Sequence, residues 1–163
     1  LGRTVFTTDF SLGAQSRVQS ALALTMLRRL DGFTQARTHN ARLFLEGIGS
    51  STRVRSVAPS PGSSPVYLRL PLLAPDEATR DGLLARLNAA GIGATGSYPR
   101  SLADVDELTD YRPARRAIVG SDVSRRILTL PTHPFVERYD VERAVAILMA
   151  DVASSPPQGS RTA

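Results

Sequence analysis

The chain has 163 residues, of which 42% are hydrophobic, and it carries 20 basic against 15 acidic residues for a net charge of +5. It has no cysteine and every basic residue is arginine, so it supplies no amine for an internal Schiff base, no phosphate-loop lysine, no thiol nucleophile and no disulfide. Two histidines are too few for a histidine-rich metal cage, and no apolar stretch approaches the roughly 20 residues of a membrane-spanning helix, so we expect neither a metal site nor a membrane span.

The first predicted element is a long interface helix region within residues 1–50. Apolar side chains recur there at more positions than one narrow stripe requires, so we expect a heavily buried helix, with Ser16 placed as its N-cap. Asp31-Gly32 interrupts the pattern as a kink or a solvated turn, and Gly47 is the expected stop. A helix pair or a bent helix of about thirty residues exceeds the globular average of roughly eleven to twelve, so it should need a partner surface.

The rest of the chain divides into three parts by composition. Residues 51–65 are rich in serine, proline and glycine and are predicted to be a linker with a short strand at 53–57. Residues 66–153 alternate between strand and helix patterns, which predicts a small α+β domain. The polar tail at 154–163 is expected to be disordered.

Prolines, glycines and capping residues mark the elements expected within 66–153. In chain order they are a strand at Val66–Leu70 bounded by Pro71, a helix that begins at Pro75-Asp76-Glu77 and ends at Gly91, a short strand at Ile92–Thr95, a helical turn at Ser101–Leu108, a short helix at Pro113–Val119, a strand at Arg126–Leu130 and a helix capped by Asp140. The fold class that follows is α+β, with a long N-terminal helix followed by a small sheet covered by helices.

Three apparent functional patterns have weak support in the residues themselves. The glycines between Gly91 and Gly96 close a predicted helix, whereas a dinucleotide fingerprint opens one. Ser97 and His133 could be grouped with an acid as a triad, but no Gly-x-Ser-x-Gly elbow is present. The arginines are dispersed and only 6% of residues are aromatic, so we expect no nucleic-acid binding. His133 follows a predicted strand in a proline-stiffened loop, where it could contact a ligand or only occupy the turn.

Two stretches together resemble the DegT/StrS-type sugar aminotransferases. The first is 17–41, which is similar to that family's "lqAAlgl.qL.rLd" helix and the arginine and alanine that follow it. The second comprises 83–99 (LLARLNAAGIGATGSYP) and 124–131 (SRRILTLP), which are similar to the family's "L...L...GI.....YP" and "s.r.l.LP" segments. Order and spacing agree over nearly residues 10–152.

The resemblance implies a type I fold that uses pyridoxal phosphate, with the lysine on a large N-terminal domain and this chain as the C-terminal, small-domain portion. In that family a Gly-x-Asn-x-Arg pattern helps to hold the cofactor phosphate across a dimer interface. Its Asn and Arg positions fall here on Leu12 and Ala14, so that part of the resemblance fails. Ser11, Ser16 and Arg17 are the possible substitutes, and we take Ser16 and Arg17 as the candidate cofactor-binding residues.

Tyr98 and His133 match positions near the family's substrate mouth, and we take them as candidate hydrogen-bonding groups for a nucleotide-linked sugar. The resemblance thus implies a portion of a nucleotide-sugar aminotransferase that has no catalytic residue of its own. It would be inert without a complementing, lysine-bearing large domain, and would work with it in a dimer. The alternative is a non-catalytic oligomerisation or ligand-binding module derived from that family. No basic-then-apolar signal segment is visible, so a cytoplasmic location is expected.

Overall fold

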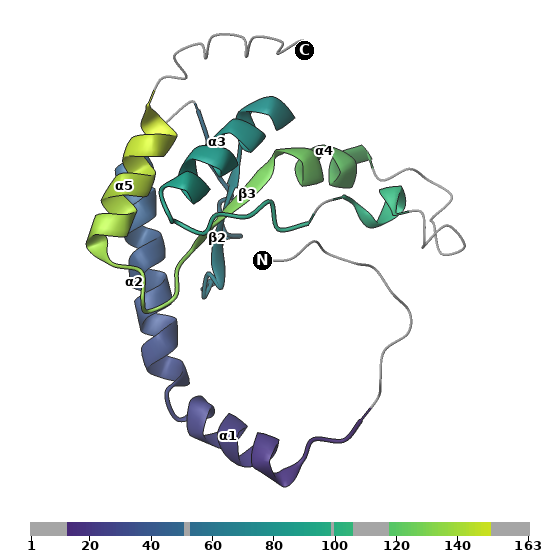
Figure 1. The fold of residues 1–163 in the computed structure, drawn as a ribbon, viewed down its shortest axis with the longest axis vertical. Helices are drawn as coiled ribbons and strands as arrows, with labels where there is room; N and C mark the ends of the chain where they lie inside the picture. The colour runs from purple at the N-terminus through teal and green to yellow at the C-terminus, as the bar shows by residue number, and fades with distance from the viewer. Residues whose placement is uncertain (1–12, 51–52, 99, 106–117, 151–163) are drawn as a thin grey trace, which may run out of the picture.

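The computed structural model describes residues 13–50, 53–98, 100–105 and 118–150. In chain order its elements are α1 (Arg17–Leu27), α2 (Leu30–Ile48), β1 (Arg55–Ser56), β2 (Arg69–Leu73), α3 (Glu77–Ala89), the 3-10 turn η1 (Leu102–Asp104), α4 (Ile118–Arg126), β3 (Ile127–Pro131) and α5 (Arg138–Met149) (Figure 1). The three strands form one antiparallel sheet in the order β1-β2-β3. The predicted α+β class, a long helical N-terminal part followed by a small sheet covered by helices, is confirmed.

One face of the sheet carries the hydrophobic core. Leucines that alternate along β2 and β3 point to this face, where they pack with α2, α3 and α5. α2 and α5 lie side by side (Figure 1), and they approach closely at Gly47, where an added Cβ would lie 2.7 Å from Val145 Cγ2. The largest side chains that are fully buried in this core are Phe44, Leu70, Leu72, Leu87, Leu128, Leu130 and Leu148.

The strand expected at Val66–Leu70 is displaced, because β2 begins later and continues through Pro71. Pro71 lies opposite Thr129 of β3. Thr129 uses its own N–H and C=O for Thr95, at 2.7 Å and 3.1 Å, so the pair of Pro71 and Thr129 is a non-hydrogen-bonded pair of the ladder. No donor is required from residue 71 at that position, and a proline is tolerated inside the strand.

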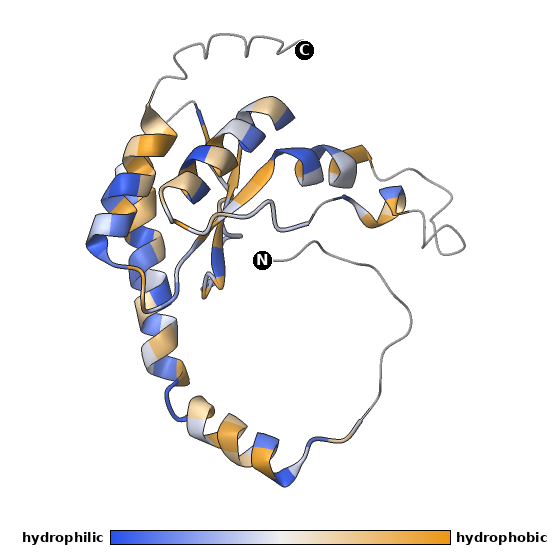
Figure 2. Ribbon diagram, in the orientation of Figure 1, coloured by the Kyte–Doolittle hydropathy of each residue, from blue (hydrophilic) through white to orange (hydrophobic). Residues whose placement is uncertain are grey.

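The heavy burial expected for the first helix is wrong for α1, which has no buried residue. Its apolar side chains remain exposed, with Val18 at 78% and Leu22 at 63%. Figure 1 shows α1 apart from the sheet, and Figure 2 shows hydrophobic residues along it. The break between α1 and α2 falls at Arg28-Arg29 rather than at Asp31-Gly32. Asp31 instead lies in the first turn of α2, where an acid stabilises the positive helix end.

Several helix ends differ by a few residues from the prediction. α2 continues past Gly47, and Gly49 with φ +53° follows its end. α5 begins before Asp140, because Glu137 is the N-cap and Asp140 accepts the backbone N–H of Glu137 as the other half of a capping box. At the end of α3, Gly91 has φ +76°, which confirms its interpretation as a helix end.

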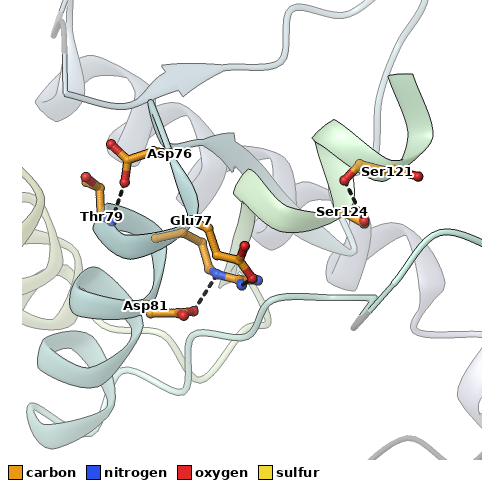
Figure 3. Close-up of polar contacts among 7 residues, drawn as sticks. Asp76, Glu77, Thr79, Asp81, Ser121 and Ser124 are labelled. Atoms are coloured by element: carbon orange, nitrogen blue, oxygen red, sulfur yellow. Dashed lines mark hydrogen bonds and ion pairs between the residues drawn. The ribbon is translucent and has the colours of Figure 1, made fainter. Parts of the chain in front are cut away.

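The start of α3 and the neighbouring α4 are held by local polar contacts (Figure 3). Asp76 Oδ1 accepts the Thr79 N–H at 2.7 Å, and this hydrogen bond holds the pKa of Asp76 below its ordinary value. Arg80 Nε lies 2.6 Å from Asp81 Oδ1. In α4, the hydroxyl of Ser124 donates to the carbonyl of residue 121 at 3.0 Å. Acidic side chains in the first turn stabilise the positive end of α3.

The remaining predictions have mixed outcomes. The short strand expected at 53–57 is confirmed as β1, and the strand at 126–130 is confirmed as β3, one residue later. The strand at 92–95 is reduced to a single bridge between Thr95 and Thr129. Most of the helix expected at 113–119, the end of the helical turn at 101–108 and the tail lie outside the described residues. Helix α4 was not anticipated over most of its length.

Candidate functional site

Arg69 of β2 is the centre of a polar network on the face of the sheet opposite the core. It lies there because strand side chains alternate and its neighbour Leu70 belongs to the core. Its Nε donates to Thr129 Oγ1 at 2.7 Å, and its Nη2 donates to the carbonyl oxygens of Gly93 and Thr129 at 2.7 Å and 3.0 Å. All three acceptors are uncharged, and burial lowers the pKa of Arg69 from its ordinary value. An arginine stays protonated under such conditions, so a positively charged guanidinium lies on this face of the sheet.

The network continues to the turn that carries Tyr98. Thr95 Oγ1 lies 3.1 Å from Thr129 Oγ1 and accepts the Ser97 N–H at 3.4 Å. Ser97 has φ +61°, and the Tyr98 N–H donates to the carbonyl of Gly96 at 2.8 Å. A three-residue turn whose central residue has positive φ is strained when that residue has a side chain. Such strain is found mainly at functional positions. Tyr98 itself is 69% exposed.

A second turn, after β3, carries His133 and is fixed by α2. The buried Asn40 side chain donates through Nδ2 to the carbonyl of His133 at 3.1 Å, with the carbonyls of Thr132 and Val136 at 3.3 Å and 3.4 Å. The Val136 N–H donates back to the His133 carbonyl at 3.0 Å. The His133 ring is exposed and lies 6.0 Å from the Phe135 ring between centroids. The backbone of this turn is therefore fixed while its imidazole faces solvent.

The same end of the sheet contains the other strained residue, Tyr67, with φ +54°. The Thr132 hydroxyl donates to the carbonyl of Tyr67 and lies 3.3 Å from that of Leu68. Arg37 of α2, one turn before Asn40, donates to the Leu68 carbonyl at 2.7 Å. Arg69 pairs with Pro131, next to Leu68 and Thr132, so both arginines act at the same end of the β2–β3 pair.

Tyr98 and His133, the two predicted substrate-binding residues, lie at opposite ends of β3. Thr95 is antiparallel to Thr129, so the chain from Thr95 to Tyr98 runs towards the beginning of β3. His133 follows the end of the strand. The five residues of β3, at about 3.3 Å each, therefore lie between the two positions.

Ser16 and Arg17, the two predicted cofactor-binding residues, lie at the exposed start of α1. Ser16 Oγ accepts the Gln19 N–H at 3.2 Å, and Gln19 Oε1 accepts the Ser16 N–H at 2.8 Å. This capping box leaves the Ser16 hydroxyl proton and the Arg17 guanidinium available to an anion at the positive helix end. Within the described chain, no hydrogen bond, ion pair or ring contact joins any two of the four predicted residues.

The sequence interpretation missed the polar residues that hold the two turns. Arg37 and Asn40 lie three residues apart on the otherwise apolar face of α2, and a polar residue on such a face is a usable signal. Arg69 and Thr129 alternate with core leucines on their strands, which placed them on the opposite face. Their mutual contact depends on strand register, which the alternation alone does not give.

The described part of the chain contains no group of three or more His, Asp or Glu residues that could hold a metal ion. Nor does it include a helix both long enough and apolar enough to cross a membrane.

A family model for the DegT/DnrJ/EryC1/StrS aminotransferase family matches residues 8–149. Among solved structures, the chain is similar to DesV of S. venezuelae, with 24% identity and a TM-score of 0.71, and to a DegT DnrJ EryC1 StrS aminotransferase of Brucella abortus, with 25% identity and a TM-score of 0.70. Each match covers 80% of this chain and 34% of the other. Helicobacter pylori PseC, an aminotransferase of pseudoaminic acid biosynthesis, is 18% identical with a TM-score of 0.71, covering 91% of this chain and 41% of PseC.

The chain therefore spans well under half the length of these structural relatives. A comparison with curated proteins finds no match.

Proposed function

The chain belongs to the DegT/DnrJ/EryC1/StrS aminotransferase family, and on this premise we propose that it is the C-terminal portion of a nucleotide-sugar aminotransferase. The observation that carries the proposal is a family match over residues 8–149 in a chain without a single lysine. Transamination with pyridoxal phosphate requires an amine on the enzyme to bind the cofactor and move a proton. We therefore propose that the chain is inert alone and acts with a lysine-bearing large domain.

The described residues fit one end of pyridoxal phosphate. The exposed Arg17 guanidinium and the Ser16 hydroxyl, at the positive end of α1, would hold its phosphate. When bound, the cofactor supplies an electron sink for the carbon that carries the transferred amino group. The complementing large domain would supply the contacts to the ring and the lysine.

Helix α1 is the proposed contact with that domain. Val18, Leu22 and Met26 recur at every fourth position along it, and all three are exposed. Exposed apolar side chains in this arrangement are typical of a surface that a partner covers. The assembled enzyme is proposed to be a dimer, as the sequence resemblance implies, and to be cytoplasmic.

Tyr98 and His133 are the proposed contacts with the nucleotide-linked sugar. Tyr98 is the stronger candidate, because an exposed phenol on a strained turn is well placed to donate a hydrogen bond to a ligand. His133 lies on a turn that Asn40 holds in place, at the other end of β3. A ligand that touched both residues would have to be extended, so they would contact different parts of it.

The test is activity with and without a complementing domain. The purified chain mixed with pyridoxal phosphate, glutamate and a nucleotide-linked keto sugar should form no product and show no imine absorbance. Adding a lysine-bearing large-domain chain of the same family should restore both, and a lysine-to-alanine variant of that domain should not. Robust transamination by the chain alone would overturn the proposal.

The second candidate is a non-catalytic oligomerisation or ligand-binding module derived from the family. The exposed apolar side chains of α1, together with the missing lysine, favour it. It predicts that the chain forms a defined oligomer by light scattering and that no large-domain chain restores activity.

A further inference from the structure

The structure has two described residues other than glycine with positive φ, and an arginine network lies beside each. Ser97 precedes Tyr98, and its amide is connected to Arg69 through two threonines. Tyr67 precedes β2, and its carbonyl accepts the hydroxyl of Thr132 beside Arg37. Positive φ strains any residue with a Cβ, so surrounding contacts must hold each turn in place.

Arg69 contacts the segment from Gly93 to Ser97 directly at Gly93 and indirectly, through two threonines, at Ser97. Its Nη2 bonds directly to the Gly93 carbonyl at 2.7 Å. Its Nε occupies a lone pair of Thr129 Oγ1, which leaves the Thr129 hydroxyl proton for an oxygen of Thr95. Thr95 in turn accepts the Ser97 N–H.

The backbone alone ties this segment to the sheet at one place. Thr95 forms a single bridge with Thr129, and no further ladder pair flanks it. An isolated bridge leaves the residues on either side of it free to change conformation. The guanidinium fork supplies additional bonds to this segment, as does the Asn88 side chain, which donates through Nδ2 to the Ala94 carbonyl at 3.0 Å.

We propose that Arg69 is the positioning residue for the Tyr98 turn: its fork, acting through Thr129 and Thr95, fixes Ser97 in the left-handed conformation that presents the phenol. This inference rests on the proposed substrate role of Tyr98 for its functional meaning. The effect of Arg69 on the turn does not depend on that role. Lysine could not replace Arg69, because an ammonium lacks a planar fork to reach Thr129 Oγ1 and the Gly93 carbonyl together.

Nuclear magnetic resonance of the full chain tests the proposal, because a left-handed residue gives a strong intraresidue cross-peak between HN and Hα. In Arg69→Met the Ser97 cross-peak should weaken, while that of Tyr67 should persist. Exchange of the Thr95 amide hydrogen should become about tenfold faster, the factor expected from losing one or two hydrogen bonds. Arg37→Met is the matched control and should leave Ser97 unchanged.

A general loss of stability would affect both turns in either variant, so the separate responses distinguish positioning from support of the whole fold. An unchanged Ser97 in Arg69→Met, or equal weakening at Ser97 and Tyr67, would overturn the proposal. If Arg69→Met fails to fold, Thr129→Val removes only the connecting hydroxyl and should release Ser97 in the same way. The Tyr98 role is tested separately, by substrate binding to Tyr98→Phe in the assembled enzyme. If the Ser97 signal is lost in the variants above but Tyr98→Phe binds substrate normally, the proposal that Arg69 positions the turn stands and the substrate role of Tyr98 is refuted.

Discussion

Helices α1 and α2 are adjacent in the sequence and both carry regularly spaced apolar residues, yet only α2 has buried residues. Phe44 of α2 is fully buried in the core, whereas Leu22 of α1 is 63% exposed. Apolar spacing therefore shows that a helix face is destined for burial, but not whether the covering surface belongs to the same chain. The difference favours a covering surface for α1 that lies on a partner domain.

The largest expected effect separates these two helices directly. Phe44→Ala should lower the free energy of unfolding by about 3–5 kcal/mol, because it removes a fully buried ring and leaves a cavity. Leu22→Ala should change it by no more than about 0.5 kcal/mol, since that side chain is exposed. Urea unfolding followed by circular dichroism measures both. Similar losses in the two variants would mean that α1 packs within this chain.

A second effect concerns the polar residues on the buried face of α2. Asn40→Leu should cost about 1–3 kcal/mol, because it removes the amide that donates to the Thr132, His133 and Val136 carbonyls and leaves the His133 carbonyl only the Val136 N–H. His39→Ala, on the exposed side of the same helix, is the control and should stay within about 0.5 kcal/mol. Equal stability of the two variants would show that the Asn40 amide does not hold the turn.

Two glycines of α2 should respond in opposite directions to alanine. Gly47→Ala should cost about 1–3 kcal/mol, since the new Cβ would lie 2.7 Å from Val145 Cγ2 at the contact with α5. Gly32→Ala meets nothing within 4 Å and should stabilise the helix by up to about 1 kcal/mol. Thermal unfolding of the two variants gives the comparison, and a stabilising Gly47→Ala would contradict the close packing of α2 and α5.

The smallest effect is a dependence of stability on pH at the cap of α3. The Thr79 N–H lowers the pKa of Asp76 from its ordinary value of 3.8 in the folded chain. A carboxyl whose pKa is lower in the folded chain stabilises the fold at any pH above its ordinary pKa. This stabilisation is lost as the pH falls through the pKa of the folded chain. Asp76→Asn keeps a capping oxygen but does not titrate, so it should lose less stability than the original chain as the pH falls below 3.8. If the stability of both chains depended on pH in the same way, Asp76 would not contribute to the pH dependence.

Local signals in the sequence predicted much of the fold. Gly91 ends α3 and the alternating leucines of β3 define a core strand, because both depend on residues close together in the chain. Pro71 was predicted to end its strand, but β2 continues through it. A proline is tolerated there because Thr129, its partner, forms its hydrogen bonds with Thr95 on the other side of β3.

The candidate site was less predictable than the fold. Tyr98 and His133 were identified by resemblance, but their separation along β3 depends on an antiparallel register that single-sequence patterns do not encode. The same is true of the contact between Arg69 and Thr129. The exposure of α1 was missed because its apolar residues cannot reveal which chain covers them.

The central claim is that α1 is exposed in this chain and is covered by a complementing domain. Hydrogen exchange measured by mass spectrometry on the full chain, alone and mixed with a lysine-bearing large-domain chain of the family, tests it most directly. In the chain alone, α1 should exchange quickly while the Phe44 end of α2 is protected; in the mixture, α1 should become protected as transaminase activity appears. Protection of α1 in the monomeric chain alone, or active mixtures in which α1 still exchanges quickly, would contradict the account.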